Sequence, residues 1–197
     1  AEAPATLLKI SVVNDQTIRV TAVPGRKFSD AKSLVVIDQK TKPQFTLLEE
    51  EGYVTVATAR VKARVALATG QVTFTDENGN LLLQEREGGR HFTPIEVEGT
   101  RGFTMQQVWE SPEDEAFFGL GQHQSDEFNY KGRNEELFQY NTKVSLPVVV
   151  SDRNYGILWD NYSLSRFGDP REYADLSIFK LYNAKGEEGG LTASYLT

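Results

Sequence analysis

Apolar and polar residues alternate with a period of two along much of the first half of the chain. Residues 9–12 and 17–22 alternate in this way on either side of a polar turn at 14–16, and residues 61–67 begin with apolar side chains at the odd positions. Successive side chains of a strand point to opposite faces, so this pattern is typical of strands with one buried face. No stretch keeps the 3.6-residue apolar period of a helix over three turns.

The segment between residues 71–75 and 81–84 predicts a β-hairpin. Asn78 and Gly79 stand between two apolar runs, and both residue types tolerate the positive φ that a tight hairpin turn requires. The segment also holds carboxylates and amides, so a calcium-binding loop is the alternative. The glycine comes too early for an EF-hand loop, however, and no Glu follows at the required distance.

Further strands are expected where short apolar and aromatic runs recur at a spacing of about 8–12 residues. These runs are residues 34–37, 53–57, 103–108, 116–120, 137–140, 146–150, 155–159 and 176–182. Pro147 within one of them indicates an edge position or a bulge, because proline has no backbone N–H to donate. Residues 86–101 are polar and Gly-rich, and we expect a long loop there. The whole pattern predicts an all-β sandwich or barrel.

Composition narrows the class of protein. The chain has 197 residues, 39% of them hydrophobic and 11% aromatic, and carries a net charge of −7. An acidic chain lacks the basic field that attracts nucleic acid, so we expect no nucleic-acid partner. No run of 18 apolar residues predicts a membrane span, and the first five residues do not resemble a cleavable signal. The absence of cysteine excludes disulfides and thiolate metal sites and leaves the compartment open.

Single residues with catalytic potential form no recognisable pattern. His91 and His123 have no second histidine at metal-ligand spacing, and neither has a Ser and Asp companion for nucleophilic catalysis. The Gly119–Gly121 pair is too short for a phosphate-binding fingerprint and indicates a strand bend instead. We therefore assign no metal, no cofactor and no catalytic residue.

Acidic residues are numerous, and glycoside hydrolysis needs two of them facing one sugar at about 5–5.5 Å or 6.5–9.5 Å. The candidates near turns or aromatic segments are Asp126, Glu127, Asp152, Asp160 and Asp169. Asp126 and Glu127 are adjacent and would point to opposite faces of a strand. Acidic surface loops are the simpler interpretation of all five, and no pair is predicted to converge.

Residues 117–162 form the most distinctive stretch, because aromatic rings alternate there with amides and small turn residues. Sugars are bound by such mixtures, since a ring covers the apolar side of a pyranose and amides bond its hydroxyls. The same aromatics could simply be core. Both interpretations remain open at the level of composition.

Three motifs in this stretch resemble the N-terminal β-sandwich domain of glycoside hydrolase family 31, closest to its bacterial α-xylosidase and α-glucosidase branch. They lie at residues 118–122, 140–142 and 155–161. The resemblance implies a galactose-mutarotase-like antiparallel sandwich in a retaining, exo-acting α-glycosidase, whose catalytic aspartates belong to a separate (β/α)₈ barrel. Such a barrel needs about 250 residues, so it lies outside this chain.

The resemblance also implies one substrate-contacting loop, which the family directs toward the mouth of the barrel. Many relatives have Trp-Asn-Arg-Asp there, whereas this chain has Tyr140, Asn141, Thr142 and Lys143. A carboxylate contact with the leaving sugar is therefore not expected. The predicted substrate-binding residues are Tyr140, Asn141 and Thr142, with Gln122 and His123 from the preceding strand region.

The resulting expectation is a single N-terminal β-sandwich domain over residues 1–197, with 183–197 a linker or the start of a strand leading to an absent module. The sandwich would then lack its last strands. The domain would pack on the catalytic barrel of the same parent chain and help bind an oligosaccharide, with xyloglucan a candidate. A free-standing carbohydrate-binding module and a mutarotase-like enzyme are the alternatives. The expected location is the bacterial periplasm or cell surface, with the cytoplasm as alternative.

Overall fold

The structure is a computed structural model that describes residues 7–37, 42–125, 127–168 and 178–193. Within these residues the chain forms thirteen strands, all pairing antiparallel, and no α-helix. The all-β antiparallel class predicted from the alternating pattern is confirmed.

One layer is a six-stranded sheet in which every strand pairs with its sequence neighbour. Its strands are β3 (Thr46–Glu50), β4 (Tyr53–Ala57), β5 (Val61–Ala66), β6 (Val72–Asp76), β7 (Leu81–Val97) and β8 (Thr100–Glu110). The hairpin predicted around Asn78 and Gly79 is confirmed as the β6–β7 turn. Gly79 has a φ of 89°, which the absence of a Cβ makes accessible.

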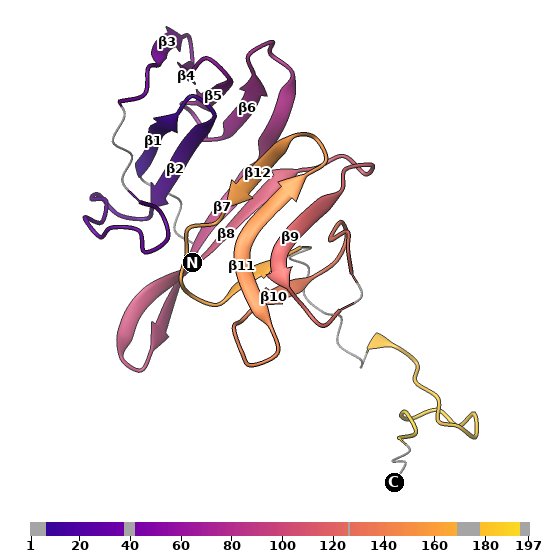
Figure 1. Ribbon diagram of the computed structural model, residues 1–197. Helices are drawn as coiled ribbons and strands as arrows, with labels where there is room; N and C mark the ends of the chain where they lie inside the picture. The colour runs from indigo at the N-terminus through magenta and orange to yellow at the C-terminus, as the bar shows by residue number, and fades with distance from the viewer. Residues whose placement is uncertain (1–6, 38–41, 126, 169–177, 194–197) are drawn as a thin grey trace.

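The other layer combines a hairpin with a small sheet (Figure 1). The hairpin, also predicted, pairs β1 (Leu7–Asn14) with β2 (Thr17–Val23). The small sheet has the order β12-β11-β9, and a short pair joins β10 to β13. These strands are β9 (Phe117–Gln122), β10 (Glu135–Leu137), β11 (Val144–Ser151), β12 (Tyr155–Leu158) and β13 (Ser165–Phe167).

Two clusters of buried residues form the core. The first lies where β1 and β2 cover the six-stranded sheet, around Ala63, Val65 and Val72. The second lies under the small sheet, around Leu120, Tyr130 and Val149, and includes residues of β10 and β13. The rings of Trp109 and Trp159 meet edge to face at 6.1 Å between centroids, and this contact joins β8 to the end of β12.

The prediction of a long loop over residues 86–101 is wrong. These residues belong to β7 and β8, which continue as a two-stranded arm that projects from the sandwich in Figure 1. The register shifts between Glu85 and Arg90, where the arm bends. Both faces of the arm are largely exposed beyond Phe92, and the exposed residues include apolar side chains: Ile95, Val97, Phe103 and Met105.

Other predicted strands differ from the structure at the edges of the fold. Residues 34–37 form an irregular exposed segment rather than a strand, and β3 was not predicted at all. Residues 178–182 contain no strand, and only an isolated bridge joins Tyr182 to Glu188; residues 176 and 177 lie outside the described residues.

Pro147 indicated either an edge position or a bulge, and the structure shows a bulge in β11, which is the central strand of the small sheet. Its pairing with β9 shifts between Ser145 and Val149, on either side of Pro147. The carbonyl of Pro147 accepts a hydrogen bond of 2.8 Å from the backbone N–H of Trp159. The bulge therefore bends the start of β11 while the rest of the strand stays in register with β12.

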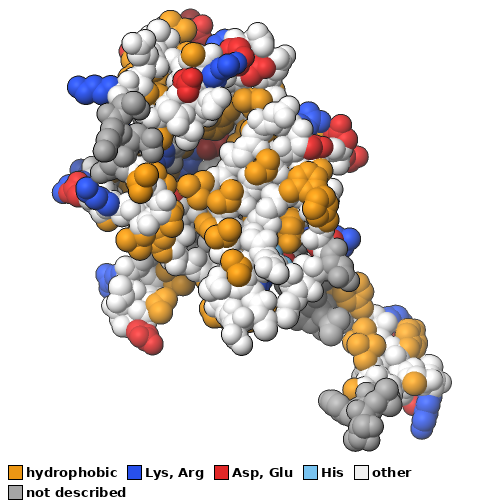
Figure 2. Space-filling view, viewed as in Figure 1, with side chains coloured by type: hydrophobic (Ala, Val, Ile, Leu, Met, Phe, Trp, Pro, Cys, Tyr) orange, Lys and Arg blue, Asp and Glu red, His pale blue; other side chains and the backbone are white. Residues whose placement is uncertain are grey.

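The outward face of the small sheet is apolar and exposed. Alternate residues of β11 and one residue of β12 expose between 38% and 51% of their surface: Val144, Leu146, Val148, Val150 and Leu158. Figure 2 shows orange side chains gathered over this region.

Candidate functional site

The loop between β10 and β11 brings three predicted site residues together. The backbone N–H of Lys143 donates to the carbonyl of Tyr140 at 3.1 Å, which closes a four-residue turn. Asn141 and Thr142 form the exposed tip of this turn, and Tyr140 is 48% exposed. The turn presents an aromatic face, an amide and a hydroxyl to the surroundings.

Gln122 lies at the base of the same loop. It is the last residue of β9, its side chain is exposed, and its Cα is paired with that of Val144 on β11. Gln139 fixes the loop from the other side: its side-chain nitrogen donates to the carbonyl of Lys143 at 2.6 Å, and its side-chain oxygen accepts from the N–H of Ser145 at 3.0 Å. Four of the five predicted residues therefore share one edge of the small sheet.

His123, the fifth predicted residue, lies beneath the loop. Its side chain is only 2% exposed, and its Nε2–H donates to the carbonyl of Leu120 at 2.7 Å. Its Nδ1 lies 3.0 Å from Oε1 of Glu135. Because the imidazole is buried, its role is structural, and a ligand has no surface of the ring to contact.

Lys143 completes a buried ionic cluster with the same carboxylate. Its side chain is 9% exposed and its Nζ pairs with Oε1 of Glu135, which is itself 13% exposed. Lys143 occupies the position at which the family resemblance implies an acidic residue. Here the side chain turns inward and anchors the loop to β10, so the turn is held from below by an ion pair.

Phe138 was not predicted as a site residue, yet the structure places it beside Tyr140. Their ring centroids are 6.0 Å apart at an angle of 35°, and Phe138 is 55% exposed. Two residues separated by one position lie on the same side of an extended chain. That spacing was the available signal, and it makes an exposed aromatic surface at the end of β10.

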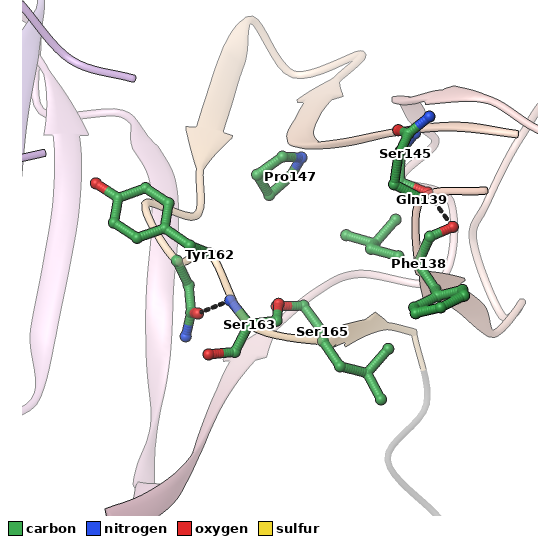
Figure 3. Close-up of a pocket in the computed structure, with 10 residues that line it drawn as sticks. Phe138, Gln139, Ser145, Pro147, Tyr162, Ser163 and Ser165 are labelled. Atoms are coloured by element: carbon green, nitrogen blue, oxygen red, sulfur yellow. Dashed lines mark hydrogen bonds between the residues drawn. The ribbon is translucent and has the colours of Figure 1, made fainter. Parts of the chain in front are cut away.

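A pocket of about 400 Å³ opens next to this aromatic surface. It lies between the bulged start of β11 and the connection from β12 to β13 (Figure 3). Phe138, Pro147 and Tyr162 supply apolar parts of its wall, and none of its lining residues carries a charge. The order of residues does not reveal this pocket, because its walls come from separate segments that the pairing of Leu137 with Ser165 and the bulge around Pro147 bring together.

The acidic candidates for glycoside hydrolysis have other partners where they are described. Asp160 accepts from Arg19 at 2.6 Å and from the hydroxyl of Ser33 at 3.0 Å. Asp152 accepts from the N–H of Ala116 at 3.1 Å, and Glu127 pairs with a guanidinium at 3.2 Å. Asp126 and Asp169 lie outside the described residues.

Two buried carboxylates elsewhere have structural partners. Glu115 is 2% exposed and accepts from the hydroxyls of Ser111, Ser151 and Tyr155 at 2.7, 2.6 and 2.5 Å. Burial, reinforced by Glu115, raises the pKa of the Tyr155 phenol. Burial likewise raises the pKa of Glu85, although its ion pair with Arg90 opposes the shift.

Among the described residues, no cluster of three or more His, Cys, Asp or Glu side chains could hold a metal ion. Over the same residues, the structure has no helix with the length and apolar character needed to cross a membrane.

A two-layer antiparallel sandwich with an aromatic, amide-bearing loop at one edge defines the class as an all-β domain of the galactose mutarotase type. The family model described as the glycoside hydrolase 31 N-terminal galactose mutarotase-like domain matches residues 7–167. The chain belongs to this family, as its motifs indicated.

Relatives of known structure and sequence agree with this assignment. The chain is similar to the GH31 α-xylosidase of Xanthomonas citri, with a TM-score of 0.86 and 39% identity over 97% of this chain and 21% of that one. It is also similar to a soil-metagenome GH31 α-xylosidase solved with xylose, with a TM-score of 0.73 and 27% identity over 81% of this chain and 26% of that one. A curated α-xylosidase of Saccharolobus solfataricus is 31% identical over 80% of this chain. The chain spans 22% of the length of that curated relative.

Proposed function

We propose that this domain serves a retaining, exo-acting α-glycosidase of the α-xylosidase or α-glucosidase type, and that it packs on the catalytic barrel without supplying catalytic residues. The observation that carries the proposal is the 39% identity to the Xanthomonas citri α-xylosidase over nearly the whole of this chain and only 21% of that enzyme. An enzyme of that length has room for a barrel of about 250 residues beyond the region matched here.

The outward apolar face of β11 and β12 supports the packing part of the proposal. A contiguous apolar patch is rare on a domain that works alone and is common where another domain binds. Val148 and Val150 lie near the middle of this face and are 38% and 49% exposed. We assign this face to the contact with the remainder of the parent chain.

The loop of Tyr140, Asn141 and Thr142 is the proposed contribution to the substrate pocket. Its tip carries neutral hydrogen-bonding groups, and the buried pair of Lys143 with Glu135 holds it in place. The loop therefore offers stacking and hydrogen bonds to a sugar without a carboxylate. Gln122, at the base of the loop, is within the same surface.

A graft tests the proposal directly. The homologous region of the Xanthomonas citri α-xylosidase is replaced by this chain, and hydrolysis of an aryl α-xyloside and an aryl α-glucoside is measured. We expect the graft to hydrolyse at least one aryl glycoside, and the 197-residue chain alone to hydrolyse neither.

In the graft, Val148→Glu places a charge within the apolar face, and we expect it to prevent stable assembly. The matched control is Leu47→Glu on the far edge strand, which we expect to be tolerated. Turnover by the isolated chain would refute the proposed division of roles. A folded graft without activity would also refute the proposed division of roles.

We further propose that the parent enzyme acts in the bacterial periplasm or at the cell surface, where oligosaccharides released from a polymer such as xyloglucan would be met. Fractionation of cells expressing the native gene, with detection by an antibody against this domain, tests the location. Recovery in the cytoplasmic fraction would contradict it.

A further inference from the structure

The neutral pocket beside Phe138 is of ligand size and adjoins the proposed substrate loop. Its volume of about 400 Å³ falls within the range of small-molecule sites, about 300–1,000 Å³. A pocket without charged walls does not select ions or phosphorylated ligands. It suits a neutral ligand that combines apolar faces with hydroxyl groups.

The polar groups in the wall are amides and hydroxyls that retain bonding capacity. The side-chain oxygen of Asn161 accepts from the N–H of Ser163 at 2.7 Å. Within the described part of the chain, the Asn161 amide hydrogens and the Ser163 hydroxyl donate no hydrogen bond. The hydroxyl of Ser165 donates to the carbonyl of Ser163 at 3.1 Å and can still accept. These groups can bond sugar hydroxyls while their own backbone contacts stay in place.

The aromatic parts of the wall complete this chemistry. Figure 3 places Tyr162 and Ser163 on the β12–β13 connection and Ser165 at the start of β13, across the space from Phe138 and Ser145. Phe138 and Tyr162 are each 55% exposed. An exposed ring beside hydroxyl and amide groups matches the two kinds of surface that a pyranose presents.

Phe138 also connects the pocket to the substrate loop, because it lines the pocket and its ring contacts Tyr140. We propose that this pocket binds one neutral sugar residue of an oligosaccharide whose neighbouring residue rests on Tyr140. The inference rests on the proposed function of the loop and extends it by one sugar site. The pocket then favours longer oligosaccharides over substrates that end at the loop.

The test compares a long and a short substrate in the same graft. Phe138→Ala removes the shared wall, and we expect it to lower kcat/KM for xyloglucan heptasaccharide about five- to tenfold, the effect of losing one aromatic contact. The aryl α-xyloside has no sugar to place in the pocket, so its kcat/KM should fall clearly less than that for heptasaccharide, and only by as much as Tyr140 depends on its contact with Phe138. Phe128→Ala is the matched control, because Phe128 is an exposed phenylalanine, 81% accessible, that contacts Phe118 and not the pocket.

A second variant separates the pocket from the loop. Ser163→Tyr narrows the pocket from the opposite wall and leaves Tyr140 and Phe138 untouched, and we expect the same selective loss with heptasaccharide. Equal kcat/KM for heptasaccharide in the wild type and in both pocket variants would overturn the inference. An active graft with that result would leave the proposed function standing, whereas a folded graft inactive on the aryl glycoside would refute the proposed function itself.

Discussion

The ion pair beneath the substrate loop allows a quantitative prediction. Lys143→Met removes the cation that pairs with Glu135, and both side chains are at least 87% buried. Loss of one partner of a buried pair costs about 3–5 kcal/mol, because the remaining charge is left without compensation. The Glu135 side chain keeps 13% of its surface in water, so we expect the lower end, about 3 kcal/mol.

Urea denaturation followed by tryptophan fluorescence measures this loss. With an m-value of about 2 kcal/mol/M, the midpoint should fall by about 1.5 M urea. Trp159 reports on the correct region, because the chain passes from β12 through Trp159 toward the pocket and its ring contacts Trp109. The loop itself should also lose order, which would weaken any contact made by Tyr140.

The neighbouring ion pair provides the control. Arg166 and Glu136 lie 3.1 Å apart on the same pair of short strands, but their side chains are 77% and 50% exposed. Arg166→Met should therefore cost only about 0.2–1 kcal/mol. In addition, Glu135→Gln combined with Lys143→Met should recover part of the stability, because no uncompensated charge remains. An equal cost for Lys143→Met and Arg166→Met would refute the reasoning.

Three further predictions concern other parts of the fold. Tyr155→Phe leaves the buried carboxylate of Glu115 with one donor fewer and should lower the free energy of unfolding by about 1.5–3 kcal/mol in thermal denaturation. Gly121→Ala should lower it by more than about 2 kcal/mol, because Gly121 has a φ of 103° and an added Cβ would lie 2.1 Å from the carbonyl oxygen of Val144. Hydrogen bonds, first of all from the Asn80 side chain, lower the pKa of Asp76 below its usual 3.8. The ionised carboxylate therefore stabilises the β6–β7 turn fully above pH 3.8, and this stabilisation is lost as the pH falls through the folded-state pKa. Amide hydrogen exchange should show the backbone of the turn losing its protection over that pH range.

Each of these three predictions has a control variant in the same chain. Gly102→Ala meets no atom closer than 4.0 Å and needs no positive φ, so it should be close to neutral. Tyr182→Phe changes a half-exposed phenol away from any buried carboxylate and should be close to neutral. Asp76→Asn should remove the pH dependence of the turn; a turn whose protection still falls with acid in that variant would contradict the assignment to Asp76.

Alternation predicted those strands that have one buried face. Residues 9–12, 17–22 and 61–67 were found because their apolar positions face the first core cluster, and residues 53–57 were found because Val56 is buried in the same sheet. Strand β3 was missed because Thr46–Glu50 is exposed along its whole length and has adjacent leucines followed by adjacent acids. The first part of the arm, residues 86–101, was missed because its glycines and polar side chains resemble a loop, whereas residues 103–108 were expected as a strand.

The site was predictable as far as it is local. Tyr140, Asn141 and Thr142 are consecutive, so a motif suffices to place them together. The inward turn of Lys143 depends on Glu135 from a different strand, and the burial of His123 depends on the packing above it. Neither contact has a signature in the order of residues, and the pocket wall formed by Pro147 and Tyr162 has none either.

The division of the core into two clusters affects how the molecule loses its structure. Ala63, Val65 and Val72 share no buried neighbour with Leu120, Tyr130 and Val149, and the link between the two groups includes a tryptophan contact and an ion pair from Arg19 to Asp160. Each end of the sandwich can therefore open as its own cooperative unit. The end that bears the loop and the pocket can change its rigidity when a neighbour or a sugar binds, while the hairpin end keeps its fold.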